Sequence, residues 1–393
     1  MKKIIILILL LTSCTDKMKD QAQKLSKEII IADGHIDLPY RLHKEGLINE
    51  KNINLSVKSS GDFDIPKAKS GGLDSPFMSI YIPSDKSEKE AFNLANSLIE
   101  LVKNIIESNE DFEHALSPQD VIDNFKNQKI SLPMGIENGS AIGKEIKNLK
   151  VFFDKGIRYI TLTHAKNNQI CDSSYDKERK WGGLSEFGKK LIYEMNNIGM
   201  MIDVSHVSDD AFFDIMKITS KPVIASHSSP RSLTPGFERN VSDEMIKLIS
   251  ENNGVILVNF GSSFVNNNSN KLYNEIDKEV ENWRLKNKYE ISNSKVLEYR
   301  ELLIKDKNPF ADIDDVLDAI DHINNLVGDN HIGFGSDFDG LGNSLPRGLK
   351  NAADYPNLIE GLLKRGYSKE SIEKICYKNF FRVWETNLQN RQI

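Results

Sequence analysis

Eight short apolar runs, each of strand length, are spread along almost the whole of this 393-residue chain. Stretches with the spacing of amphipathic helices lie between most of them, at residues 89–106, 141–155, 185–198, 209–219 and 242–252. Strands that alternate with helices predict βαβ units and a parallel sheet. The expected strands are residues 28–32, 77–82, 131–136, 158–163, 200–205, 222–226, 254–260 and 331–336. Eight such units favour an α/β fold of the TIM type, a (β/α)8 barrel.

A doubly wound sheet is the alternative, but its glycine-rich phosphate loop is missing after the first run, where Gly34 stands alone before His35. Two long insertions depart from the minimal barrel, at residues 40–76 and 261–330. The second starts with an Asn-rich loop and continues with helical spacing over residues 272–304, which predicts a helical insertion over the barrel mouth before the last strand. A substrate lid and a solvated hairpin both fit it. Residues 28–393 are expected to form one domain.

Single polar residues of metal-ligand type end five of the apolar runs, and TIM barrels place their active sites at these strand ends. His35 and Asp37 are two residues apart, so on a strand both side chains project to one face. The residues that end the other runs are Glu137, His206, His227 and Asp337. Imidazoles and carboxylates suit zinc. The pattern predicts a metallohydrolase in which a hydroxide between two cations attacks.

Two of these positions, and His164 at the end of another run, allow a second interpretation from the residues alone. Glu137 could bridge two cations or cap the following helix. Asp337 is placed to take and return a proton, or it is a strand-end Asp bonded to the amides of Asp339 and Gly340. His164, which ends the run 158–163, is as compatible with the core as with function.

The first residues are typical of a targeting segment. Lys2 and Lys3 precede an apolar run at residues 4–11 that is too short to span a bilayer, and the sequence ending in Cys14 resembles a bacterial lipobox. We expect a signal peptide at residues 1–13, a lipid on Cys14 and a tether over residues 14–27. That places the protein in the bacterial cell envelope, anchored on the periplasmic or cell-surface side of a membrane. An ordinary secretory signal with an incidental cysteine is the alternative.

The net charge of −6 and the pI near 5.9 argue against a nucleic-acid surface, and no basic stripe is present. Only Cys171 and Cys376 remain once Cys14 is assigned to the anchor, so no disulfide framework is implied.

Several longer motifs resemble those of the membrane dipeptidase (renal dipeptidase) family of the amidohydrolase superfamily, in order and spacing, over about residues 28–385. They are DGHIDLP at 33–39, GIENG at 135–139, YITLTH at 159–164, LS-FG at 184–188, IDVSHVS at 202–208, PVIASHSS at 222–229, RNV at 239–241 and GFGSDFDG at 333–340.

The resemblance implies hydrolysis of dipeptides by an enzyme with two Zn²⁺ per chain, and the C-terminal residue of the substrate can be of D configuration. One ion is implied at His35, Asp37 and Glu137, and the other at Glu137, His206 and His227. Asp337 is implied as the proton carrier to the leaving amine.

The same resemblance implies that His164 stabilises the oxyanion and that Arg239 holds the substrate carboxylate, a task that suits a guanidinium fork. Phe264 stands where some members have Tyr. Barrel proteins of this kind often dimerise, although no surface patch in the sequence identifies an interface. A related binuclear amidohydrolase acting on another amide or ester is the second hypothesis, and a non-catalytic lipoprotein is the third.

Overall fold

The computed structural model describes residues 17–389, in which eight parallel strands form a closed barrel in the order β1-β10-β9-β8-β7-β6-β5-β2. The barrel strands are β1 (Ala32–Ile36), β2 (Ser75–Tyr81), β5 (Met134–Glu137), β6 (Ile157–Thr161), β7 (Met201–Asp203), β8 (Ile224–Ala225), β9 (Val255–Val258) and β10 (Ile332–Phe334). The short strands β3 (Phe112–Glu113) and β4 (Ile130–Ser131) pair separately. The expected TIM-type barrel is confirmed.

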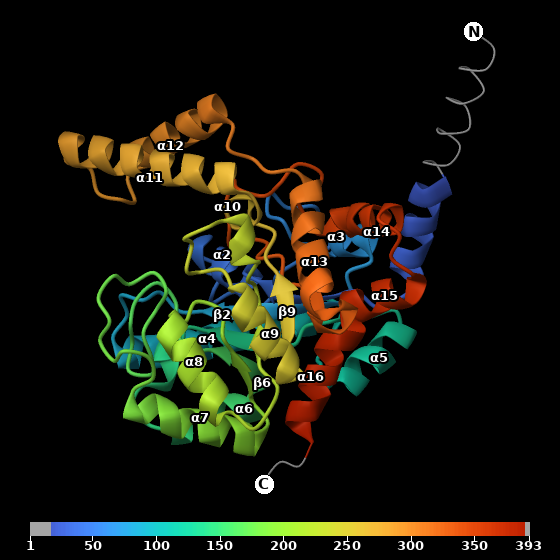
Figure 1. Cartoon of the computed structure of the whole chain (residues 1–393), viewed down its shortest axis with the longest axis horizontal. Helices are drawn as coiled ribbons and strands as arrows, with labels where there is room; N and C mark the ends of the chain where they lie inside the picture. Colours follow the sequence, from blue (N-terminus) through green and yellow to red (C-terminus); the bar gives the residue numbers. More distant parts are fainter. Residues whose placement is uncertain (1–16, 390–393) are drawn as a thin grey trace.

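Helices surround the barrel, as Figure 1 shows. They are α2 (Leu38–Lys44), α3 (Ile65–Gly71), α4 (Glu88–Ser108), α5 (Pro118–Lys126), α6 (Lys147–Asp154), α7 (Glu186–Ile198), α8 (Asp209–Ile218), α9 (Asp243–Glu251), α13 (Ile313–Val327), α14 (Tyr355–Lys364), α15 (Lys369–Glu373) and α16 (Asn379–Leu388). Serine side chains accept a backbone N–H at the starts of α4, α5, α7, α8 and α9. Serine is among the best N-cap residues, so the sequence itself marks where these helices begin.

Large apolar side chains fill the barrel interior, so it is a packed core and not a pore. Phe77, Tyr159 and Leu257 from three strands are fully buried there, and they belong to one cluster with Phe380 and Trp384 of α16. The ring centroids of Phe77 and Trp384 lie 5.0 Å apart. The C-terminal helix thus closes one end of the barrel, and the other end is left for the polar residues described below.

The first strand lies further along the chain than expected. Residues 28–32 were expected to form it, but β1 begins at Ala32 and includes Gly34 and His35. Asp33 is tolerated inside this strand because its carboxylate accepts the backbone N–H groups of His35 and Ser336. Gly34 is required by crowding, since a Cβ there would lie 2.2 Å from the Leu257 side chain.

The long insertion before the last strand is helical, as expected. Its first turns, α10 (Ser262–Val265) and the start of α11 (Asn267–Asn287), occupy the segment expected to be an Asn-rich loop, and Asn266 caps α11 by accepting the N–H of Ser269. Helices α11 and α12 (Ser294–Lys307) form a hairpin that projects away from the barrel in Figure 1. Helix α13 at the end of the insertion returns to pack against β9 and β10.

The chain is already packed before residue 28, where the domain was expected to begin. Residues 17–28 are helical, and Ala22 and Leu25 are buried in the main core. Their apolar side chains face the domain, so residues 17–27 are not free tether. The signal peptide, Cys14 and the rest of the tether lie outside the described residues. Between residues 17 and 389, no helix combines the length and apolar character needed to cross a bilayer.

Candidate metal centre and active site

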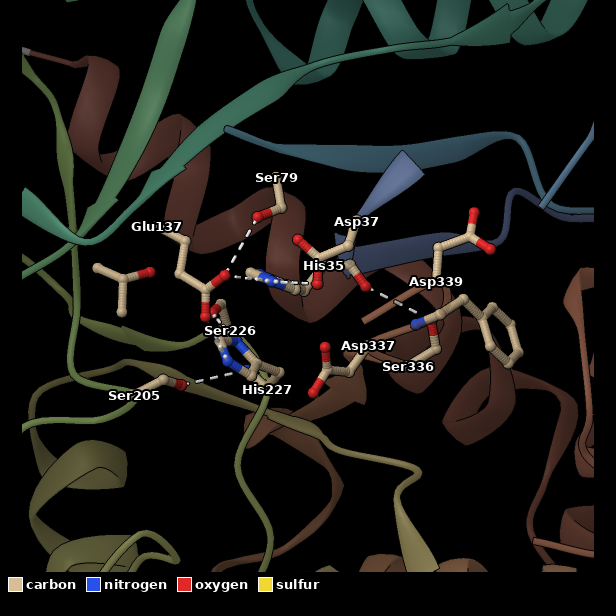
Figure 2. A network of polar contacts seen from close by, with 12 residues as sticks. His35, Asp37, Ser79, Glu137, Ser205, Ser226, His227, Ser336, Asp337 and Asp339 are labelled. Carbon is tan, nitrogen blue, oxygen red and sulfur yellow. Dashed lines mark hydrogen bonds and ion pairs between the residues drawn. The ribbon is translucent and has the colours of Figure 1, made fainter. Parts of the chain in front are cut away.

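Side chains from separate strands converge at the mouth of the barrel, at the end opposite to α16. His35 is in β1, Glu137 is the last residue of β5, and His206 and His227 follow β7 and β8 within three residues. Figure 2 shows Glu137, His35, His227 and Asp337 directed toward one another. Barrel closure thus brings together residues that are up to 302 positions apart, from His35 to Asp337.

The carboxylate of Glu137 stands between two groups of ligand atoms. Its Oε2 lies 3.3 Å from His35 Nε2, which in turn lies 3.6 Å from Asp37 Oδ2. Its Oε1 lies 3.1 Å from His206 Nε2 and 3.3 Å from His227 Nε2. The two oxygens of one carboxylate therefore face two separate sets of donors.

The site has buried ligand atoms that the protein itself does not satisfy. Within residues 17–389, His35 Nε2 and Asp37 Oδ1 have no hydrogen-bond partner, although the His35 side chain is fully buried. The Nε2 atoms of His206 and His227 lie only 2.8 Å apart. Unpaired buried polar atoms are costly. Because a divalent cation relieves both features and binds nitrogen and oxygen donors of this kind, the residues fit metal ions.

Electrostatics separate the roles of the imidazoles. Burial lowers the pKa of His206 and His227 well below the usual value, and the nearby Arg239 charge acts in the same direction, so both rings are neutral donors. For His35, burial opposes the charged form, but Tyr159, Glu137 and Asp37 raise its pKa well above the usual value. The groups around His35 therefore favour a positive charge on that side of Glu137. Burial opposes ionisation of Glu137 itself, but the surrounding histidines hold its pKa well below the usual range.

Asp337 lies beside this centre, and among residues 17–389 only one of its two carboxylate oxygens has a hydrogen-bond partner. Asn259 Nδ2 donates to its Oδ2 over 2.9 Å. Gly340 and Asp339 do not donate to the Asp337 carboxylate: the Gly340 N–H donates to the Asp337 backbone carbonyl, and the Asp339 N–H donates to Asp62. Burial raises the pKa of Asp337 well above the usual value, and Asp37 and Glu137 add to this effect. Its environment thus favours a carboxyl group that holds a proton.

The backbone around the site is held in unusual conformations. His206 and Asp337 have φ values of 70° and 63°. Positive φ is uncommon for residues other than glycine and is often found at functional sites. Gly340 allows the loop after β10 to close over the site, because a Cβ there would lie 2.2 Å from Asp37 Oδ2 and 2.4 Å from Asp337 Oδ1.

A cavity of about 740 Å³ opens onto these residues. Its lining comprises Asp37, Tyr40, Lys44, Tyr81, Glu137, His164, Ala165, Tyr175, His206, Arg239, Phe264, Asp337, Asp339, Gly340 and Leu341. His164 Nε2 lies 3.5 Å from Glu137 Oε1, and burial lowers its pKa. No residue of α11 or α12 lines the cavity, so the hairpin does not cover it, and from the insertion only Phe264 of α10 lines it.

Arg239 is buried in the cavity wall, with 3% of its surface exposed. Its Nη1 donates to Ser228 Oγ over 2.7 Å and its Nη2 to the His227 carbonyl over 2.9 Å, whereas its Nε has no partner within residues 17–389. The neighbouring Arg231 instead forms two hydrogen bonds to Asp209, of 2.6 and 2.7 Å. The two arginines thus differ in kind: one is available to a ligand and the other is committed to the fold.

Several residues of the site were not anticipated. The ring centroids of Tyr81 and His164 lie 4.8 Å apart in an edge-on arrangement. The ring centroids of Tyr175 and His206 lie 5.8 Å apart, and the loop that carries Tyr175 has no recognisable pattern in the sequence. Asn259 carried a signal, because it is a polar residue inside an apolar run. The four other histidines of the chain, His43, His114, His322 and His331, do not line the cavity.

Comparison with known proteins extends this description. Residues 19–392 match the family described as membrane dipeptidase (peptidase family M19). Dipeptidase tcpJ of Claviceps purpurea (strain 20.1) is 30% identical over 384 residues, which cover 95% of this chain and 80% of that protein. The probable dipeptidase PvdM from Pseudomonas aeruginosa has a similar structure, with a TM-score of 0.82, 25% identity and coverage of 95% of this chain and 99% of that one.

A metallopeptidase from Rhodobacter sphaeroides shares the fold, with a TM-score of 0.75 at 23% identity, over 91% of this chain and 99% of that one. That protein was crystallised with a phosphinate mimic of the dipeptide L-Ala-D-Ala.

Proposed function

This chain belongs to the membrane dipeptidase family of metallopeptidases, and on that premise we propose that it is a zinc-dependent dipeptidase with two Zn²⁺ per chain. The observation that carries the proposal is Glu137, whose two oxygens face two separate sets of buried donors. A carboxylate in that position suits a pair of ions better than a single one.

We assign the ligands from these distances. His35, Asp37 and Glu137 would hold one ion, and Glu137, His206 and His227 the other. When bound, the ions supply Lewis-acid polarisation of the scissile carbonyl and an activated water. Zinc is proposed because nitrogen and carboxylate donors suit it.

Arg239 would bind the C-terminal carboxylate of a dipeptide. Its guanidinium is buried, lines the cavity and retains an unpartnered Nε–H, and arginine suits planar recognition of carboxylates. His164, also in the cavity wall, is a neutral imidazole that would donate to the scissile carbonyl oxygen as negative charge develops there. These two contacts orient the peptide bond over Glu137.

Asp337 would carry the proton from the attacking water to the leaving amine. Its raised pKa favours the protonated form that the second half of this transfer needs. The hydrogen bond from Asn259 holds one carboxylate oxygen and leaves the other to face the centre. Asp337 is thus proposed as the general base and acid of the reaction.

Substrates with a C-terminal D-residue are part of the proposal. A cavity of about 740 Å³ lies within the range of small-ligand sites and exceeds the needs of a small dipeptide. The Rhodobacter sphaeroides protein of the same fold has bound a mimic of L-Ala-D-Ala, which makes that dipeptide a rational first test.

The decisive experiment is hydrolysis of L-L and L-D dipeptides by the purified chain, as isolated, after chelation and after return of zinc, with metal content measured in parallel. We expect amino-acid release that is lost on chelation and restored by zinc, at two bound ions per chain. An N-acetylated dipeptide amide, which lacks both charged termini, should not be cleaved. Cleavage of other amides or esters with no release from any dipeptide would overturn the proposal in favour of the wider amidohydrolase class.

We also propose that Cys14, which lies outside the described residues, is lipidated after removal of residues 1–13 and anchors the enzyme in the bacterial cell envelope. Replacement of Cys14 by Ser should move the protein from the membrane fraction to the soluble fraction. The homodimer stays a prediction, which light scattering of the purified chain tests directly.

A further inference from the structure

Two chains of hydrogen bonds, or relays, each end on a histidine that is a candidate metal ligand. In His227 and in His35, the Nδ1 atom contacts a hydroxyl group, Ser226 Oγ at 2.7 Å and Tyr159 Oη at 3.0 Å. The Nε2 atom of each ring lies 3.3 Å from an oxygen of Glu137. If a hydroxyl donates its single proton to another group, it can only accept from the imidazole, so Nδ1 must carry the hydrogen.

The relay behind His227 starts at Asp203, a fully buried carboxylate at the end of β7. Its Oδ1 accepts the N–H groups of Ser205 and Ser226, and its Oδ2 accepts the hydroxyls of Thr161 and Ser226, the latter over 2.6 Å. Because Ser226 gives its one proton to Asp203, its oxygen must accept a hydrogen from His227 Nδ1. His227 therefore presents a bare lone pair at Nε2.

The relay behind His35 leads to the same result with different parts. The Tyr159 hydroxyl donates to the Gly34 carbonyl over 3.0 Å, and a carbonyl can only accept. Tyr159 Oη must then accept a hydrogen from His35 Nδ1, which leaves the Nε2 side of that ring for the centre. Gly135 makes room for this tyrosine, since a Cβ there would lie 2.1 Å from its ring.

We propose that Asp203, acting through Ser226, and Tyr159 are positioning residues that hold His227 and His35 with hydrogen on Nδ1, so that each Nε2 is kept for a divalent cation. This inference rests on the proposed metal centre. Groups that orient metal-binding histidines in this way commonly change metal affinity when they are mutated. Neither residue lines the cavity, so neither touches substrate.

Asp203→Asn tests the relay because it should reverse the direction of hydrogen donation between residue 203, Ser226 and His227. The amide oxygen must remain at the position that accepts two backbone N–H groups, so the amide nitrogen faces Ser226 and becomes a donor. The Ser226 hydroxyl then points its proton at His227 Nδ1, and hydrogen moves to Nε2. Ser226→Ala is a second variant that removes the link and leaves Asp203 in place. Thr161→Val is the matched control, because it removes a different hydroxyl from the same carboxylate oxygen.

The first readout is the ¹⁵N spectrum of histidine-labelled, metal-free protein, and the second is zinc affinity measured by competition with a chromogenic chelator. We expect Asp203→Asn to move one histidine to the Nε2–H form and to weaken one zinc site by about 10- to 100-fold. Tyr159→Phe should weaken the other site similarly, and Thr161→Val should change neither readout.

An unchanged histidine spectrum and unchanged zinc affinity in Asp203→Asn would overturn the proposal. If that variant fails to fold, wild-type zinc affinity in Ser226→Ala would overturn it equally. Wild-type chain that binds zinc and shows the expected histidine forms without cleaving dipeptides would contradict the proposed function and leave the relays standing.

Discussion

The barrel mouth and the α11–α12 hairpin differ in which side chains they bury: the mouth buries polar side chains, whereas the hairpin exposes large apolar ones. At the mouth, His35 and Glu137 are buried, and His35 Nε2 has no hydrogen-bond partner among residues 17–389. On the hairpin, Ile291 and Leu302 leave 74% and 64% of their surface exposed, and ion pairs such as Arg284 with Glu281 lie at the surface. Buried polar atoms without partners are costly, whereas exposed apolar residues and surface ion pairs contribute little either way.

The difference teaches where the molecule is sensitive. At the mouth, a side chain such as Glu137 contacts several candidate metal ligands. The same chemical change should therefore lower activity far more there than on the hairpin. On the hairpin, a small separate cluster that includes Tyr273 and Ile276 holds two helices together without reaching the cavity. Matched substitutions in the two regions test this contrast directly.

The largest effect is expected for Glu137→Gln. One charge is lost from between two sets of donors, so bound metal should fall and kcat/KM should drop by about 10³-fold or more, as for groups that act as a unit. Glu298→Gln on the exposed face of α12 makes the same chemical change and should leave both unchanged. Metal content and steady-state kinetics should be measured for both variants. Full activity of Glu137→Gln would remove this carboxylate from the centre.

Asp337→Asn should lower kcat by about 10²- to 10⁴-fold while metal content stays at the wild-type value, because it removes a proton carrier. Asparagine tolerates the positive φ of this position, so the variant should fold. Asp306→Asn on the hairpin is the control. Turnover at the wild-type rate would exclude Asp337 from proton transfer, and loss of metal would make it a ligand instead.

Arg239→Ala should raise KM for dipeptides by about 10- to 100-fold, the value of a hydrogen bond to a charged group, with metal content unchanged. Arg300→Ala on the hairpin, where the arginine pairs with Asp277, should leave KM unaltered. Kinetics with a dipeptide and with its C-terminal amide sharpen the test, since the amide should be equally poor for both Arg239→Ala and wild type. An unchanged KM in Arg239→Ala would contradict the assignment.

The smallest effect on catalysis is expected for Trp283→Ala. The Trp283 ring stacks on Tyr299 at 4.6 Å, so its loss should expose hairpin amides to hydrogen exchange without changing kcat/KM. Ile291→Lys at the exposed tip should change the free energy of unfolding by no more than about 0.5 kcal/mol. A drop in kcat/KM in Trp283→Ala would show that the hairpin is coupled to the barrel mouth.

Much of the barrel was predictable because its strands are apolar and its helices begin at serine caps. Residues 255–258, for example, are Val-Ile-Leu-Val, so this strand is apolar on both faces. The first strand was misplaced because Asp33 and Gly34 break its apolar pattern, and only hydrogen bonds to His35 and Ser336 make the Asp33 carboxylate tolerable there. Helix 17–28 was missed because only two of its apolar side chains, those of Ala22 and Leu25, are buried, which is too few to give a periodic apolar pattern.

The candidate ligands were predictable for a related reason. A lone His or Glu that ends an apolar run can be found by inspection, and barrel topology places such ends together. Tyr175 was not predictable, because it comes from a loop without periodicity. Asp203 and Asn259 could have been found as polar residues within apolar runs, but their partners could not.

The sequence by itself determined the fold class and the strand ends from which the site is built, because both follow from the spacing of apolar and polar residues along the chain. Only the tertiary structure decided which atoms meet. The two oxygens of Glu137 divide the ligands into two sets, and Ser226 and Tyr159 direct the hydrogens of two imidazoles. These arrangements depend on contacts between strands far apart in the chain, and such contacts exist only once the barrel has closed.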